Sequence, residues 1–282
     1  MSEQSDHVRP DMNDQSERVR RFAELHTPGR PLLLPNPWDA GSAKLLAWLG
    51  FEALATTSSG FAATLGRRDG AVTRDEALAH AAAIVAVTDL PVSADLENGF
   101  ADSPEGVAET AAGAVDAGLA GSSIEDFSGL ADDPIYPLEL AAERVAAAAR
   151  TAHGGPVSLV LTARSENYLH GREDLADTIA RLQAYQTAGA DVLYAPGLAS
   201  AADLRTLLAE VQKPVNVLAR PGMPPVAELA ALGVSRVSVG GAFAFGVIAG
   251  VVTAARELRE RGTYGFAAEA AAGARAARQA FG

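Results

Sequence analysis

The sequence predicts an α/β fold, a (β/α)8 TIM-type barrel with a C-terminal helical extension. Eight short runs of aliphatic and β-branched residues alternate with longer stretches whose apolar residues recur at helical spacing. Several helical stretches stop at a glycine just before the next apolar run, as in "AGADV" (188–192) and "LGVSRVSV" (232–239). Repeated strand–helix steps of this kind favour a closed parallel barrel.

A doubly wound open sheet is the alternative for a chain with this alternation. That fold usually has fewer strands and a G-x-G-x-x-G fingerprint after the first one. Here the first apolar run leads into "NPWDAGSA" (36–43), which lacks the fingerprint. The barrel is therefore the preferred prediction.

The predicted strands are short, and the helices between them carry recognisable start and stop signals. The strand ranges are 31–35, 53–58, 91–96, 121–126, 157–164, 191–196, 214–220 and 236–241. Thr73, with Glu76 three residues later, fits a capping box, and Ser103 before Pro104 fits an N-cap followed by a proline at the first helical position. The predicted helix-ending glycines are Gly50, Gly118, Gly189 and Gly233.

We divide the chain into three parts on this basis. Residues 1–20 are expected to form a flexible or short helical N-terminal arm, and residues 21–255 the barrel. Residues 256–282 are expected to form a C-terminal helical segment, which is compatible with exchange onto a neighbouring subunit in an oligomer.

Composition excludes several classes of function. The chain has 282 residues, a net charge of −12 and no cysteine. The acidic balance disfavours nucleic-acid binding, and the missing cysteine excludes disulfides, thiolate metal sites and cysteine nucleophiles. The polar N-terminus has no apolar signal core, and no apolar stretch reaches membrane-spanning length without interruption. We expect a soluble cytoplasmic protein with neither membrane nor nucleic-acid partners.

Polar side chains follow the predicted strands at their carboxyl ends, where the active sites of parallel barrels lie. Asp95 and Glu97 end the third strand, Glu125 ends the fourth, and Arg164 ends the fifth. Tyr194 and Asn216 come from the sixth and seventh strands. Converging carboxylates need a cation, and Mg²⁺ with oxygen ligands fits that need, whereas Arg164 suits a substrate carboxylate.

Each of these residues also has a purely structural interpretation. A lone carboxylate at a strand end, such as Asp95, often only caps the next helix. Arg164 has Glu125 and Glu166 as competing ion-pair partners, and strand alternation points Asp126 away from Glu125. Convergence from adjacent strands is what favours a shared site.

Five segments together resemble the isocitrate lyase/phosphoenolpyruvate mutase superfamily. They are "NPWDAGSAKLLAWLGFEAL" (36–54), "SSGFAATLGRRDG" (58–70), "ADLENGF" (94–100), "SSIEDFSG" (122–129) and "TARSENYL" (162–169), in the family's order along successive strands. The resemblance runs from about residue 20 to residue 250. It implies a Mg²⁺-dependent enzyme (Mn²⁺ is an alternative) that forms an enolate from a small 2-oxo acid or a related substrate.

The resemblance also implies roles for individual residues. Asp95, Glu97 and Glu125 match the family's metal-shell acids. Arg164 matches the arginine that grips the substrate.

Three further residues match the family's pattern in the segment that follows the second predicted strand. Ser59 and Gly60 match a turn whose backbone amides hold the substrate carboxylate or oxyanion, and Asp69 matches an acid near metal and substrate.

The departures from the family's pattern restrict the reaction. The segment after the fourth strand (124–145) has none of the Lys, Cys and His of the family's mobile catalytic loop, and no Asn of the phosphonate-acting members. The family's strand-six His aligns with Pro196. This pattern is typical of a divergent subgroup that lacks the catalytic Cys loop.

The resulting expectation is a Mg²⁺-dependent carbon–carbon lyase or decarboxylase acting on a small 2-oxo or 2-hydroxy carboxylate, such as a dicarboxylate. With no cysteine, a metal-shell carboxylate or Tyr194 is left as the base for a retro-aldol cleavage. The alternatives are hydrolysis or rearrangement of a P–C bond, and a barrel that binds 2-oxo acids without turnover. We expect a homo-oligomer, dimer or tetramer, because members of the family usually assemble.

Overall fold

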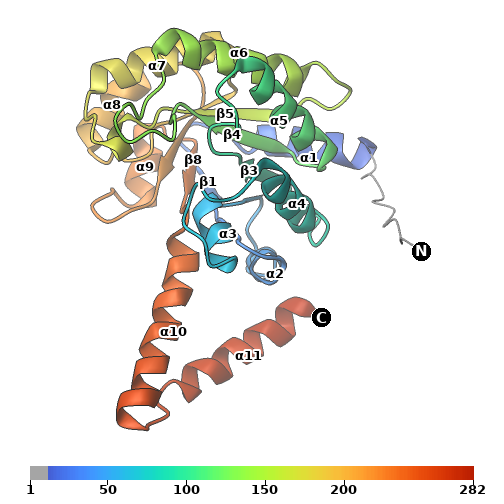
Figure 1. The fold of residues 1–282 in the computed structure, drawn as a ribbon, viewed down its shortest axis with the longest axis vertical. Coiled ribbons are helices and arrows are strands. Elements are labelled where there is room, and N and C mark those ends of the chain that lie inside the picture. The colour runs from blue at the N-terminus through green and yellow to red at the C-terminus, as the bar shows by residue number, and fades with distance from the viewer. Residues whose placement is uncertain (1–11) are drawn as a thin grey trace.

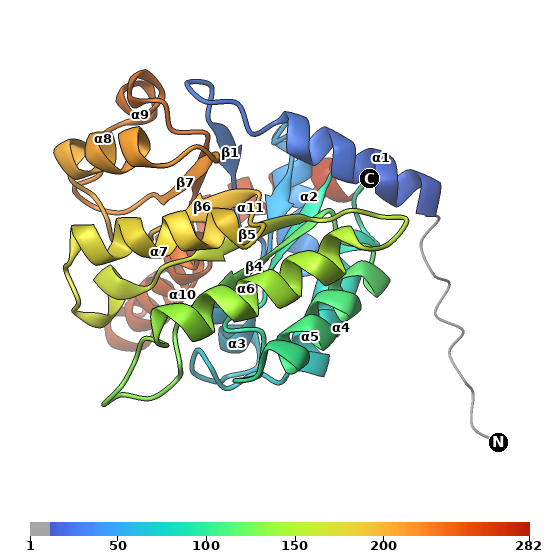
Figure 2. The ribbon, with the colours of Figure 1, turned by 90° about the horizontal axis from the view of Figure 1, so that it is seen from above.

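The structure, a computed structural model, describes residues 12–282. Residues 1–11, the first part of the expected N-terminal arm, lie outside the described residues. Eight parallel strands form one sheet in the order β1-β8-β7-β6-β5-β4-β3-β2. The sheet curls into a nearly closed barrel with helices around it (Figures 1 and 2). The predicted (β/α)8 barrel is confirmed.

Each strand lies inside its predicted range. The strands are β1 Leu32–Leu34, β2 Leu54–Ala55, β3 Val92–Asp95, β4 Gly121–Glu125, β5 Val160–Arg164, β6 Val192–Tyr194, β7 Val215–Leu218 and β8 Arg236–Ser238. The apolar runs locate them well because a barrel strand is buried on its outer face by helices.

The helices follow the strands in the order expected of a barrel, and the short helix after β2 was not predicted from the sequence. They are α1 Met12–Glu24, α2 Ala40–Trp48, α3 Ser58–Thr64, α4 Arg74–Val85, α5 Pro104–Asp116, α6 Leu138–His153, the 3₁₀ helix η1 Asn167–His170, α7 Leu175–Thr187, α8 Ala201–Glu210, α9 Val226–Leu232, α10 Ala242–Arg261 and α11 Ala267–Phe281. The capping box of Thr73 and Glu76 and the N-cap of Ser103 before Pro104 are confirmed.

Backbone and side-chain hydrogen bonds close the barrel between β1 and β2. β1 and β2 share no ladder, but the Ala55 amide donates to the Pro35 carbonyl at 3.1 Å. The side chain of Asn36 donates to the Thr56 carbonyl at 3.0 Å and accepts from the amides of Val239 and Gly240 at 3.0 and 2.9 Å. One buried amide therefore ties the ends of β1, β2 and β8 together.

The hydrophobic core lies between the strands and the helices. Leu161 and Ala163 of β5 pack outward into it against Leu182 and Tyr185 of α7. The alternate residues of each strand point into the barrel, where Thr162 is fully buried. Inward positions are unusually polar for a barrel interior.

A buried contact joins the amino end of the barrel to its interior. His26 follows α1, and its Nδ1 lies 2.7 Å from the Phe22 carbonyl, so Nδ1 carries the proton and donates. Nε2 therefore accepts from Nη1 of Arg236 at 3.1 Å. Burial, reinforced by the Arg236 charge, lowers the pKa of His26 to about 3, so the ring is neutral.

The described part of the N-terminal segment is helical and packed. α1 crosses the boundary expected at residue 20 and buries Phe22 against the barrel. Gln15, also buried, donates to the carbonyls of Val115 and Leu119, both at 3.0 Å. Residues 12–20 are thus held by the barrel through apolar contact and side-chain hydrogen bonds.

The boundary expected at residue 255 lies inside α10, which runs unbroken from Ala242 to Arg261. Figure 1 shows α10 leaving the barrel and α11 returning toward α2. Most of α10 is exposed, Ala244 being its one buried residue. No helix within residues 12–282 combines the length and apolarity needed to cross a bilayer.

Gly121→Ala tests the close approach of α1 to the barrel. A Cβ at this position would lie 2.7 Å from the Val160 carbonyl oxygen and 2.8 Å from Cε1 of Phe22. We expect the free energy of unfolding to fall by about 1–3 kcal/mol, measured by urea denaturation. Gly273→Ala in α11 is the control, since its Cβ meets nothing within 4 Å. Equal stability of the two variants would contradict the packing described.

His26 should make the protein sensitive to acid. The folded-state pKa lies below the unfolded value, so the unfolded chain binds more protons as pH falls from about 6.5 toward 3. We expect wild type to lose about 2 kcal/mol more than His26→Gln between pH 7.5 and pH 5. Urea denaturation of both proteins at both pH values measures this difference, and equal losses would argue against a buried neutral His26.

Candidate active site

A cavity of about 190 Å³ opens at the carboxyl ends of the strands. Asp95, Glu125, Arg164 and Tyr194 are the last residues of β3, β4, β5 and β6, so the barrel itself brings them to one rim. Of the residues singled out in the sequence, those that line the cavity are Ser59, Asp69, Asp95, Arg164, Tyr194 and Asn216. Gly60, Glu97 and Glu125 lie beside it.

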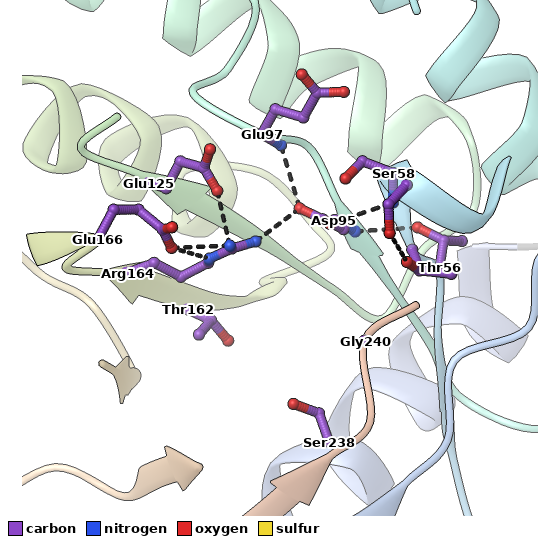
Figure 3. A network of polar contacts seen from close by, with 12 residues as sticks. Thr56, Ser58, Asp95, Glu97, Glu125, Thr162, Arg164, Glu166, Ser238 and Gly240 are labelled. Atoms are coloured by element: carbon purple, nitrogen blue, oxygen red, sulfur yellow. Dashed lines mark hydrogen bonds and ion pairs between the residues drawn. The ribbon is translucent and has the colours of Figure 1, made fainter. Parts of the chain in front are cut away.

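Arg164 is the centre of this rim. Its Nη1 lies 2.9 Å from Asp95, its Nη2 lies 2.9 Å from Glu125, and its Nη2 and Nε lie 2.8 and 2.9 Å from Glu166. Figure 3 shows the three carboxylates around one guanidinium. Both ion-pair partners that the sequence offered, Glu125 and Glu166, are used, and Asp95 is a third.

Further hydrogen bonds from backbone amides hold the Asp95 carboxylate. Its Oδ2 accepts from the Ser58 amide at 3.2 Å, and its Oδ1 accepts from the Glu97 amide at 3.3 Å. Its own amide donates to the Thr56 hydroxyl at 3.0 Å. The carboxylate is therefore positioned by β2 and α3 as well as by Arg164.

The rim holds more negative charge than Arg164 can balance. Burial raises the pKa of Glu125 well above its ordinary value and that of Glu166 in the same direction, although Arg164 works against both shifts. The pKa of Asp69 is also raised, chiefly by burial and further by Asp95. One guanidinium faces several carboxyl groups, so an additional cation would relieve the repulsion between them.

The donor set fits a divalent metal ion in its chemistry. Carboxylate oxygens are the ligands that Mg²⁺ prefers, and few are required because the ion keeps several waters. Within residues 12–282, however, no three acidic or histidine side chains already converge as ligands of a single ion. Asp95 and Glu125, two of the three acids expected around a metal, are instead paired with Arg164, which lies between them.

Glu97 leaves the strand in an unusual direction. Its φ is +48°, in the left-handed region that few non-glycine residues adopt. Its side chain lines a smaller hollow next to the main cavity, together with Phe61 and His80, and Figure 3 shows it pointing away from Arg164. Burial, with the charges of Asp95 and Asp69, raises the pKa of Glu97 to about 7.

Ser59 and Gly60 belong to the first turn of α3 and not to an open turn. Thr57 is the N-cap of this helix, and its hydroxyl accepts from the Gly60 amide at 3.4 Å. The Ser59 hydroxyl lies 3.2 Å from the Thr57 hydroxyl. Ser59 thus lines the cavity. The Gly60 amide, which was expected to bind a substrate carboxylate or oxyanion, instead donates to the hydroxyl of the N-cap residue Thr57.

Tyr194 and Asn216 line the part of the cavity that β6 and β7 form. Burial raises the pKa of Tyr194 to about 12, so its hydroxyl is neutral at physiological pH and is a poor base. The Arg164 guanidinium lies 5.3 Å from the Tyr194 ring centroid. Asn216 donates to Ser238 at 3.0 Å, and its Oδ1 is buried without a hydrogen-bond partner.

Asp126 and the segment after it form a structural support next to the site. Asp126 faces away from the cavity, as strand alternation predicted, and accepts from Arg181, from Tyr185 and from the Glu166 amide. Residues 127–137 fold into a tight loop closed by a bridge between Phe127 and Ile135. Arg236, which was not predicted as a site residue, also lines the cavity. Its place at the start of an apolar strand suggested no chemistry.

Comparisons with known proteins agree with this architecture. Residues 22–259 match the family model for phosphoenolpyruvate phosphomutase. Two crystal structures from Burkholderia cenocepacia J2315 are similar. One, provisionally described as a lyase/mutase, is 53% identical, has a TM-score of 0.87 and aligns over 90% of this chain and 92% of that chain. The other, provisionally described as a phosphonomutase, is 38% identical, has a TM-score of 0.81 and aligns over 88% and 100%.

A curated enzyme is similar at lower identity. The 2-methylisocitrate lyase of Escherichia coli is 32% identical over 209 residues, which cover 68% of this chain and 69% of that enzyme. The family match spans nearly the whole barrel, including every strand that carries a residue of the rim. The chain therefore belongs to the phosphoenolpyruvate phosphomutase family, within the isocitrate lyase/phosphoenolpyruvate mutase superfamily of lyases and mutases.

Proposed function

We propose that the protein is a Mg²⁺-dependent carbon–carbon lyase or decarboxylase that converts a small 2-oxo or 2-hydroxy dicarboxylate through an enolate. The observation that carries this proposal is the acidic rim around Arg164, set over a cavity that small polar groups line. The excess of carboxylates suits a divalent cation, and the guanidinium suits a substrate carboxylate.

The residues that would hold the cation are Asp95, Glu97 and Glu125, with Asp69 nearby. When bound, the ion would polarise the oxygens of a 2-oxo acid and stabilise negative charge that develops on them. Supporting this role, Asp95 and Glu125 come from adjacent strands and share one partner, Arg164.

Arg164 would bind and orient the substrate carboxylate. In the structure Nη1 of Arg164 contacts Asp95, and Nη2 contacts Glu125. Glu166 contacts Nη2 as well and is the acid that accepts from Nε. Glu166 can therefore keep the guanidinium in place while the other two acids change partners. The Ser59 hydroxyl and the Asn216 amide are further polar groups that face the cavity and can contact the substrate.

The loop after β4 favours reactions that need no dedicated protein acid. Residues 127–137 contain no Lys, Cys, His or Asn. Decarboxylation of a 2-oxo dicarboxylate releases CO₂ and leaves an enolate that water can protonate. A retro-aldol cleavage also needs a base for the hydroxyl, and the neutral Tyr194 is poorly suited to that task.

Chemistry at a P–C bond is the second candidate. It is supported by the phosphoenolpyruvate phosphomutase family model and by the 38%-identical structure described as a phosphonomutase. A barrel that binds 2-oxo acids without turnover is the remaining alternative, consistent with the loop composition.

A substrate panel with and without chelator tests these functions. The full chain is assayed with oxaloacetate, alkylmalates and phosphonopyruvate, following pyruvate or other 2-oxo products and free phosphate. We expect a 2-oxo product from a dicarboxylate, loss of at least about 100-fold in rate with excess EDTA, and recovery on adding Mg²⁺. Phosphate release alone would select P–C chemistry. Thermal stabilisation by 2-oxo acids without any product would select the binding protein.

We also propose that the chain forms a homo-oligomer through its C-terminal helices. α10 extends from the barrel and exposes a row of large apolar side chains. They are Phe243, Phe245, Val247, Ile248, Val251, Val252 and Leu258. Exposed apolar surface of this extent on a helix is typical of a protein–protein interface.

Val251→Asp tests this assembly. Val251 is 63% exposed in the single chain, so the substitution should leave the folding of a lone subunit unchanged. We expect wild type to have the mass of a dimer or tetramer in light scattering, and the variant to dissociate to smaller species at the same concentration. Arg259→Gln on the same helix is the control. A wild-type monomer would contradict the proposal.

A further inference from the structure

Arg236 is a buried cation at the floor of the cavity. It is the first residue of β8, points into the barrel and is 4% exposed. Its Nη1 contacts His26 and its Nη2 donates to the Thr162 hydroxyl, both at 3.1 Å. Its Nε is buried and has no hydrogen-bond partner, although Arg236 lines the cavity.

Nothing described in the structure neutralises this charge. His26 is neutral, so it accepts a hydrogen bond from Arg236 but supplies no negative charge. Burial lowers the pKa of Arg236 to about 10, which leaves the guanidinium protonated at neutral pH. Within residues 12–282 no carboxylate forms an ion pair with Arg236. Arg164 pairs with three carboxylates, and the equally buried Arg181 pairs with Asp126 and Asp177. A buried charge without a counter-ion is costly.

The barrel interior leaves space above Arg236. Inward positions that large aliphatic side chains usually fill carry Ala55, Ser93, Ser123 and Ser238 here, and all four line the cavity. The cavity, at about 190 Å³, far exceeds the roughly 10–15 Å³ that one water needs. A small ligand can therefore extend from the rim toward the floor.

The two ends of the cavity differ in charge. The rim holds several carboxylates around Arg164, and the floor holds the guanidinium of Arg236, which no carboxylate in the described part of the chain pairs and which donates to the Thr162 hydroxyl. We propose that Arg236 binds a second carboxylate of the substrate, so that the enzyme selects dicarboxylates over monocarboxylates. This inference rests on the proposed function, because it assumes that a small carboxylate enters this cavity.

The test compares two ligands that differ in one group. Malate and 2-hydroxybutyrate share the 2-hydroxy acid, but malate carries a carboxylate where 2-hydroxybutyrate has a methyl group. Their affinities for the full-length protein with Mg²⁺ are measured by calorimetry. We expect wild type to prefer malate, and Arg236→Gln to bind malate about 10- to 100-fold more weakly while its affinity for 2-hydroxybutyrate is unchanged.

Two further variants separate binding from folding. Arg236→Lys keeps the charge and should retain part of the preference for malate. Arg181→Gln disrupts another buried arginine outside the cavity, so it should lower the melting temperature without changing the ratio of the two affinities. Melting curves without ligand identify any variant that fails to fold.

The outcomes distinguish this inference from the proposed function. If Arg236→Gln weakens both ligands equally or neither, the second carboxylate is not bound there, and the proposed function still stands. If wild type binds neither acid, the inference is overturned together with the proposed function. If the malate preference depends on Arg236 while the substrate panel yields no product, the carboxylate site is supported and the lyase activity is not.

Discussion

The guanidinium of Arg164 is the interaction on which the mouth of the barrel depends. It joins acids from β3, β4 and the segment after β5, which would otherwise repel one another in a buried setting. Truncating it would leave these buried carboxyl groups without a counter-charge. The same side chain therefore holds these acids together and offsets part of the repulsion between them.

Much of the fold could be predicted because a barrel repeats one simple pattern. Several strands are short apolar runs that follow a helix-ending glycine and lead into a polar strand end, and all eight strands lie inside the predicted ranges. α3 was missed because "TTSSG" reads as a turn, although Thr57 is a good N-cap. The boundaries at residues 20 and 255 fell inside helices, because composition changes little across α1 and α10.

The candidate site was only partly predictable for a different reason. Strand order brings Asp95, Glu125 and Arg164 to one rim, and that convergence follows from the sequence. The ion pairs that form among these side chains depend on distances and burial in the folded chain. No local sequence pattern encodes those quantities. Arg236 shows this limit most clearly, since its partner His26 lies 210 positions away in the chain.

The Asn36 side chain at the β1–β2 seam also connects the C-terminal helices to the acidic rim. Its amide bonds to Gly240, just before α10, and to the carbonyl of Thr56, whose hydroxyl accepts from the Asp95 amide. Hydrogen bonds through Asn36 and Thr56 thus link the start of α10 to Asp95. The start of α10 and the position of Asp95 therefore depend on the same buried side chain.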